Sequence, residues 1–128
     1  MTLVDETAHA VLLVGHGSRN AAWFDATTAC LEVVRAQLGG VRVDIAYLDH
    51  HPDRFKPTLA GLIADGFRVS VVPLLMAPGG HLLSDIEGHL EELRNMDPAV
   101  SLRLLPTLTE FDEVKIAFAL AVQRALTA

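Results

Sequence analysis

Four short apolar runs alternate with longer amphipathic stretches along this chain of 128 residues. The first run, 10–14 (AVLLV), is apolar throughout, which is typical of a strand that is buried on both faces. Similar runs predict strands at 41–48, 68–76 and 99–105, although Pro73 is unusual inside a central strand.

The stretches between these runs predict helices. Asn20 is a suitable N-cap for a helix that continues to about residue 38, before Gly39 and Gly40. A second helix is predicted at 57–65 and a third at about 82–95. Thr109 followed by Asp112 resembles a capping box, which would open a last helix that ends near residue 126.

Strands that alternate with helices predict an α/β protein. We expect one domain, 1–128, with a doubly wound, flavodoxin-like parallel sheet of four strands. The expected strand order is 2-1-3-4, with helices on both faces of the sheet.

Composition narrows the function. The net charge of −6 argues against a nucleic-acid surface, which is usually basic. No apolar run approaches the roughly 18 residues of a membrane-spanning helix, and the N-terminus has no basic signal region. The single cysteine, Cys30, excludes an internal disulfide and is expected in the core. A cytoplasmic location is therefore the expectation.

Two histidines carry the candidate chemistry. In a sheet of this order, ligands bind beyond the carboxyl ends of the first and third strands. The loops that follow these two strands contain His16, between Gly15 and Gly17, and His81, after Gly79 and Gly80. Glycine allows sharp turns and leaves room for a ligand beside each imidazole. We therefore predict that His16 and His81 approach one another at this edge.

Two neutral imidazoles suit a divalent metal such as Co²⁺, Fe²⁺, Ni²⁺ or Zn²⁺. Two protein ligands are too few for a closed structural site. The metal is therefore expected to be held transiently, or to have its ligands completed by substrate or a second subunit, and not to be a permanently bound cofactor. Asp85 lies one helical turn after His81. Two roles remain open for it: a hydrogen bond that orients His81, or an acid that favours the helix N-terminus.

The motifs LLVGHGSRNAAW and VVPLLMAPGGHLLSDI together resemble the class II chelatases of tetrapyrrole biosynthesis, the sirohydrochlorin cobalt- and ferrochelatases known as CbiX and SirB. VDIAYLD resembles the second strand of this family, so that the resemblance covers nearly the whole chain. It implies a lyase that inserts Co²⁺, Fe²⁺ or Ni²⁺ into sirohydrochlorin, with His16 and His81 as metal ligands and proton acceptors. The chain length matches the short, single-domain members, which implies a homodimer around the tetrapyrrole.

The sequence departs from the family pattern after the second predicted strand. Asp49 stands where the family usually has Glu, and it is followed by His50 and His51. These two histidines are either exposed polar residues or additional metal ligands. The carboxylates of the tetrapyrrole would need donors, for which the candidates are Ser18, Arg19, Arg54 and Lys56, with backbone amides at helix starts.

Other functions compete with this interpretation. The same histidines suit a metal-binding or metal-delivery domain that performs no catalysis. A phosphate or nucleotide binder ranks lower, because the chain contains neither of the two common glycine-rich phosphate motifs. Neither the metal nor the choice between the sirohaem and cobalamin pathways follows from the sequence.

Overall fold

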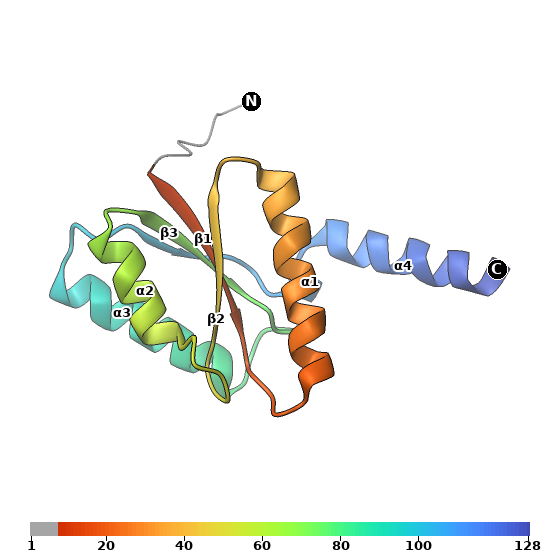
Figure 1. Ribbon diagram of the computed structural model, residues 1–128, viewed down its shortest axis with the longest axis horizontal. Helices are drawn as coiled ribbons and strands as arrows, with labels where there is room; N and C mark the ends of the chain where they lie inside the picture. Colours follow the sequence, from red (N-terminus) through yellow and green to blue (C-terminus); the bar gives the residue numbers. More distant parts are fainter. Residues whose placement is uncertain (1–7) are drawn as a thin grey trace.

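The computed structural model describes residues 8–128 (Figure 1). Residues 1–7 of the predicted domain 1–128 lie outside the described residues. The elements follow one another as β1 (His9–Gly15), α1 (Ala21–Leu38), β2 (Arg42–Tyr47), α2 (Phe55–Ala64), β3 (Arg68–Pro73), α3 (His81–Met96), β4 (Leu102–Leu104), the short 3₁₀ helix η1 (Leu108–Glu110) and α4 (Asp112–Thr127).

The four strands form one parallel sheet in the order β2-β1-β3-β4, which confirms the predicted topology. β1 is central, and Val14 pairs with Ala46 on one side and with Pro73 on the other. The carboxyl ends of β1, β2 and β3 therefore meet at one edge of the sheet, at the bottom of Figure 1.

Helices pack on both faces of the sheet. On one face, Leu31 of α1 packs with Leu13 and Val43. On the other face, α2 and α3 enclose a larger core, because strand positions alternate between the two faces. The fully or nearly buried side chains of that core are Ala10, Leu12, Val14, Ala46, Phe55, Leu59, Leu62, Val69, Val71, Ile86 and Leu90.

The ends of α1 follow the sequence signals. Oδ1 of Asn20 accepts a hydrogen bond from the backbone N–H of Ala22 at 2.9 Å, as an N-cap does. At the other end, the N–H of Gly39 donates to the carbonyl of Arg35, and the φ of Gly39 is 64°. This left-handed conformation favours glycine and stops the helix.

The third and fourth strands are shorter than predicted. β3 ends at Pro73, after which the N–H of Leu74 donates to the carbonyl of Val14 at 2.8 Å. Pro73 thus occupies the end of the strand, where its missing N–H costs least. The predicted capping box at Thr109 and Asp112 is wrong. The box joins Thr107 to Glu110 and opens η1, whereas α4 begins without a side-chain cap.

The expectation that Cys30 is buried also fails. Cys30 is exposed on α1 and does not belong to the core. Every residue of α4 is exposed, and Figure 1 shows this helix projecting away from the sheet. Within residues 8–128, no helix combines the length and the apolar character that crossing a bilayer requires.

Candidate functional site

Three loops meet at the carboxyl edge of the sheet. They follow β1, β2 and β3, and they contain or end at His16, Asp49 and His81 (Figure 1). His16 and His81 are both exposed there. Because β1 and β3 are hydrogen-bonded neighbours, the two histidine loops leave adjacent strands, as the sequence predicts.

Backbone hydrogen bonds hold the loop that carries His16 against the loop that carries Asp49. The N–H of Leu48 donates to the carbonyl of Gly15, and the N–H of Asp49 donates to the carbonyl of His16, both at 2.9 Å. Gly17 has a φ of 98°, and a Cβ built on it would lie 1.8 Å from the carbonyl oxygen of Asp49. Only glycine fits this contact, so the backbone of His16 is fixed while its imidazole faces solvent.

Asp49 is a carboxylate held close to His16. Its Oδ1 accepts a hydrogen bond from the N–H of His50 at 2.8 Å and lies 3.5 Å from Nη1 of Arg54. The backbone hydrogen bond lowers the pKa of Asp49, and the charges of His50, Arg54 and His16 lower it further. Asp49 is therefore ionised at neutral pH and adds negative charge beside the imidazole of His16.

His50 and His51 have different surroundings. His50 adopts a φ of 60° and places its Nε2 3.6 Å from Oδ2 of Asp49. Nδ1 of His51 accepts a hydrogen bond from the N–H of Asp53 at 3.0 Å, and its ring packs on Tyr47 and Phe24. These contacts occupy Nδ1 and fix the ring of His51, which favours a role in shaping the loop.

His81 is the first residue of α3, after two glycines in left-handed conformations. Gly79 and Gly80 have φ values of 96° and 85°, which allow the chain to turn sharply into the helix. Asp85 lies one turn further along α3, but within the described range 8–128 no hydrogen bond joins its carboxylate to His81. Of the two roles left open for Asp85, the orientation of His81 thus gains no support.

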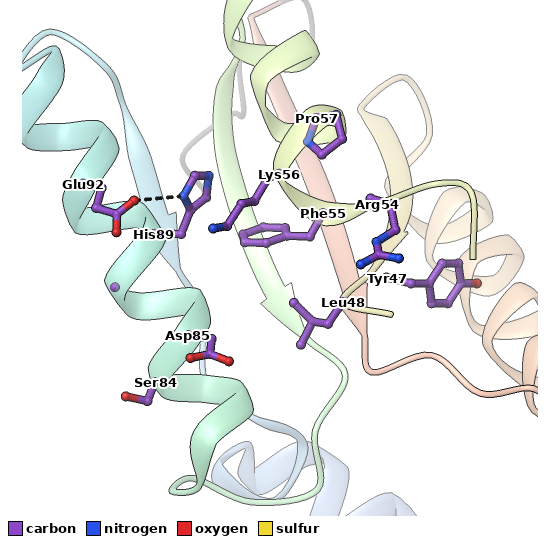
Figure 2. A pocket seen from close by; sticks show the side chains of 11 residues that line it. Tyr47, Leu48, Arg54, Phe55, Lys56, Pro57, Ser84, Asp85, His89 and Glu92 are labelled. Atoms are coloured by element: carbon purple, nitrogen blue, oxygen red, sulfur yellow. Dashed lines mark ion pairs between the residues drawn. The ribbon is translucent and has the colours of Figure 1, made fainter. Parts of the chain in front are cut away.

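A cavity of about 740 Å³ opens between α2 and α3 (Figure 2), and neither His16 nor His81 is among its lining residues. Two of its lining residues are Leu48 and Asp85. The N–H of Leu48 donates a hydrogen bond to the loop that carries His16, and Asp85 lies one helical turn from His81. The remaining lining residues are Tyr47, Arg54, Phe55, Lys56, Pro57, Ser84, Gly88, His89 and Glu92. Its volume lies within the range of small-molecule sites.

The cavity mixes charges of both signs. Arg54 and Lys56 come from the start of α2, and Asp85 and Glu92 come from α3. In Figure 2, Lys56 and Phe55 extend from α2 toward His89 on α3. Such a site can bind a ligand that carries both acidic groups and N–H donors.

His89 is a cavity residue that the sequence patterns described above did not single out. Its ring lies edge-on to Phe55 at 5.6 Å, and Glu92 approaches Nδ1 at 3.6 Å. Nδ1 is buried and forms no hydrogen bond in the described structure. The available signal was the spacing of His81, Asp85 and His89, which places all three on one side of α3.

The remaining predicted donors sit in the loop after β1. Oγ of Ser18 accepts a hydrogen bond from the N–H of Asn20 at 3.0 Å and so shapes the start of α1. Arg19 is exposed and forms no ion pair with any residue of the range 8–128. Its guanidinium is free to bind an anionic ligand at this edge.

No cluster of three or more His, Cys, Asp or Glu side chains suited to a metal ion occurs among the described residues. The exposed imidazoles of His16 and His81 each still offer nitrogen atoms to a metal or a proton. Chemically, this edge can hold an ion briefly and accept protons from a ligand lying across the loops.

Comparison with known proteins places these features in context. The CbiX family model matches residues 10–125. No curated protein sequence matches the chain. The crystal structure of a protein from Marinobacter aquaeolei VT8, assigned to CbiX of cobalamin (vitamin B12) biosynthesis, superposes with a TM-score of 0.77 at 24% identity. The match covers 93% of this chain and 98% of that one.

Two structures of SirB are similar to part of the chain. The sirohydrochlorin chelatase SirB from Bacillus subtilis subspecies spizizenii, in complex with cobalt, gives a TM-score of 0.68 at 24% identity over 79% of this chain and 44% of that one. SirB from Bacillus subtilis with Fe³⁺ gives a TM-score of 0.67 at 24% identity. That match covers 79% of this chain and 40% of the SirB chain. The chain thus spans less than half the length of SirB, and at this identity the likeness shows the fold.

Proposed function

The chain belongs to the CbiX family, and we propose that it inserts a divalent metal into sirohydrochlorin. One observation carries the proposal: the exposed residues His16 and His81 leave neighbouring strands at the same edge, beside a cavity of about 740 Å³. This arrangement leaves space for a macrocycle next to two groups that bind metals and accept protons.

Metal insertion needs two roles from the protein. The incoming ion replaces two pyrrole N–H protons, so two protons leave for each ion that enters. A neutral imidazole of one histidine holds the ion while the other accepts a proton. Because both side chains are exposed, this proton and the second one pass on to solvent in turn. Asp49 places a negative charge close to His16, where a metal cation would arrive.

The substrate carries many carboxylates, and the edge supplies cations for them. Arg54 and Lys56 line the cavity, and Arg19 stands free in the loop after β1. Gly79 and Gly80 add exposed backbone before α3, and the start of that helix favours negative charge. We place Asp85 near the pyrrole nitrogens and away from the carboxylated rim, because like charges repel.

The choice of metal follows the chemistry of the ligands. Imidazole binds Co²⁺, Fe²⁺ and Ni²⁺, and the similar SirB structures contain cobalt or Fe³⁺. The product would serve cobalamin or sirohaem biosynthesis in the cytoplasm. A homodimer would complete the tetrapyrrole cleft, because one chain spans less than half the length of SirB.

The decisive experiment measures metal insertion into sirohydrochlorin by its visible absorption spectrum. His16→Ala and His81→Ala are compared with the unmodified chain, using Co²⁺, Fe²⁺ and Ni²⁺ in parallel. His9→Gln is the matched control, because His9 begins β1 at the opposite edge of the sheet. We expect both alanine variants to lose at least tenfold in rate while the control retains it. Full activity in both alanine variants would show that His16 and His81 do not form the site of metal insertion.

The competing function is a metal-delivery domain that does not catalyse insertion. It is favoured by the two-imidazole arrangement alone, without the cavity. In that case the chain would bind Co²⁺ through His16 and His81, yet the rate of insertion would be the same with and without protein.

A further inference from the structure

A group of polar and basic side chains lies at the amino edge of the sheet, opposite the loops that carry the two histidines of the proposed site (Figure 1). The proposed function gives these side chains no role. We call the group the amino-edge cluster, and it consists of His9 in β1, Arg68 and Ser70 in β3, and Arg103 in β4.

The strand register places the four side chains on one face of the sheet. His9 pairs with Arg68 across β1 and β3, and Ser70 pairs with Arg103 across β3 and β4. Paired residues of neighbouring parallel strands point to the same face, and so do residues two positions apart on one strand. Neighbouring strands lie about 4.8 Å apart, so side chains from all three strands can reach one small ligand.

The cluster interrupts an otherwise apolar face. Further along the same strands, Val11, Leu13 and Val72 belong to the apolar core that packs against α1. Ser70 is one of two polar or charged side chains that are buried among the described residues. Burial of a hydroxyl costs free energy unless it is hydrogen-bonded, so apolar packing does not explain Ser70.

A hydrogen bond holds His9 within the cluster. Nε2 of His9 lies 2.9 Å from Oγ of Ser70. When the hydroxyl of Ser70 donates to Nε2, the neutral ring carries its own proton on Nδ1. The ring of His9 forms no other hydrogen bond within residues 8–128. His9 is therefore able to donate from Nδ1 to a ligand in its neutral form and in its charged form.

The two arginines of the cluster lack a counter-charge in the described part of the chain. Arg68 and Arg103 are exposed, and no ion pair within residues 8–128 includes either of them. Burial lowers the pKa of His9, and the positive charges of Arg68 and Arg103 lower it further. An anion placed among these groups would offset their mutual repulsion.

The basic groups of the neighbouring elements are already paired. Arg42 in β2, at the same edge, lies 3.1 Å from Asp44. Arg35, in the last turn of α1 on the same face, lies 3.3 Å from Glu32 and 3.6 Å from Asp44. The chain as a whole has a net charge of −6. Two arginines without a carboxylate partner therefore distinguish the amino-edge cluster from its surroundings.

We propose that the amino-edge cluster binds a phosphate group. Arg68 and Arg103 supply planar forks of N–H donors, which match the oxygens of phosphate. Nδ1 of His9 supplies a further donor from the third strand. A phosphate group offers at least three oxygens to these three side chains, whereas a carboxylate offers two. Inorganic phosphate and phosphate monoesters share this chemistry. The site lies at the other edge of the sheet from His16 and His81, so it does not depend on metal insertion.

The pKa of His9 tests the site, because a bound anion stabilises the protonated imidazole. It is measured on the full chain from the pH dependence of the histidine NMR signals, with and without millimolar phosphate at constant ionic strength. His9→Gln identifies the signal. We expect saturable binding that raises this pKa by at least about half a unit, and a much smaller effect of acetate. An unchanged pKa in phosphate, or an equal effect of acetate, would overturn the proposal.

Substitution of the arginines tests which groups bind the anion. Arg68→Gln and Arg103→Gln should each weaken phosphate binding by about fivefold or more, because each removes a charged donor. Arg42→Gln is the matched control, since it removes the same charge at the same edge from an arginine that already has a partner. Unchanged affinity in both cluster variants, or an equal loss in the control, would refute the assignment.

Two further arms distinguish the source of the anion. Glycerol phosphate is titrated beside inorganic phosphate. Tighter binding of the monoester would assign the site to a phosphorylated metabolite, equal binding would assign it to the free ion, and both results support a phosphate site. Asp5 and Glu6 precede the described residues, and they are replaced together by Asp5→Asn and Glu6→Gln. A response to phosphate in this variant alone would show that carboxylates of the chain itself occupy the cluster, which would contradict the proposal.

Discussion

Replacement of Gly17 by alanine tests the contact that holds His16 in place. The added Cβ would lie 1.8 Å from the carbonyl oxygen of Asp49, far inside contact distance, and the φ of 98° is unfavourable for any residue with a side chain. The backbone strain alone costs about 1–3 kcal/mol. Displacement of the loop after β2 adds about 1–3 kcal/mol, as overpacking does in a well-packed region.

Gly66→Ala is the matched control. Gly66 has a φ of 90°, but no atom lies within 4 Å of a Cβ built on it. This variant should therefore lose only the strain of about 1–3 kcal/mol. The difference between the two variants isolates the close approach of the His16 and Asp49 loops.

The assay is urea unfolding at one protein concentration, followed by circular dichroism and by the fluorescence of Trp23, the single tryptophan. A fixed concentration matters because dimerisation changes apparent stability. We expect Gly17→Ala to be less stable than Gly66→Ala by about 1–3 kcal/mol and to insert metal more slowly. Free energies of unfolding that agree within about 0.5 kcal/mol would refute the proposed contact.

Three further predictions concern α1, the amino edge of the sheet and the substrate. Asn20→Ala should lower the free energy of unfolding by about 1 kcal/mol because the helix loses its cap, whereas Asn20→Asp should retain most of it in urea unfolding; equal losses would contradict the capping role. Burial lowers the pKa of His9 below its ordinary 6.5, and the charges of Arg68 and Arg103 lower it further. Because the unfolded chain then binds the proton more readily than the folded chain, the free energy of unfolding falls as the pH drops below 6.5. His9→Gln should flatten this fall in pH-dependent unfolding, and an unchanged slope would show that His9 is not its source. Arg19→Glu should raise KM for sirohydrochlorin severalfold with little loss of stability, with Arg19→Gln intermediate; an unchanged KM in both would exclude Arg19 from substrate binding.

Local signals predicted most of the fold correctly. The apolar run at 10–14, the cap at Asn20 and the stop at Gly39 each depend on neighbours within a few residues, and the structure reproduces them. Strand order also followed from sequence, because short right-handed connections leave few arrangements for alternating strands and helices. His16 and His81 were placed at the correct edge for the same reason.

Choices between similar local patterns required the tertiary structure. Thr107 with Glu110 and Thr109 with Asp112 have the same capping spacing. Thr107 is fully buried, and the N–H groups of Leu108 and Thr109 donate to carbonyls of the loop after β3. These contacts with residues far away in the sequence favour the capping box of Thr107 and Glu110, and the local sequence cannot predict them.

The sequence by itself determined the order of elements, the sheet and the edge at which the two histidines lie, because these depend on periodicity, caps and chain connectivity. Only the tertiary structure decided that Cys30 is exposed, that His89 lines a cavity and that α4 leaves its own sheet. Those features depend on which surfaces face each other, and a residue has the same local sequence whether its side chain is exposed or buried.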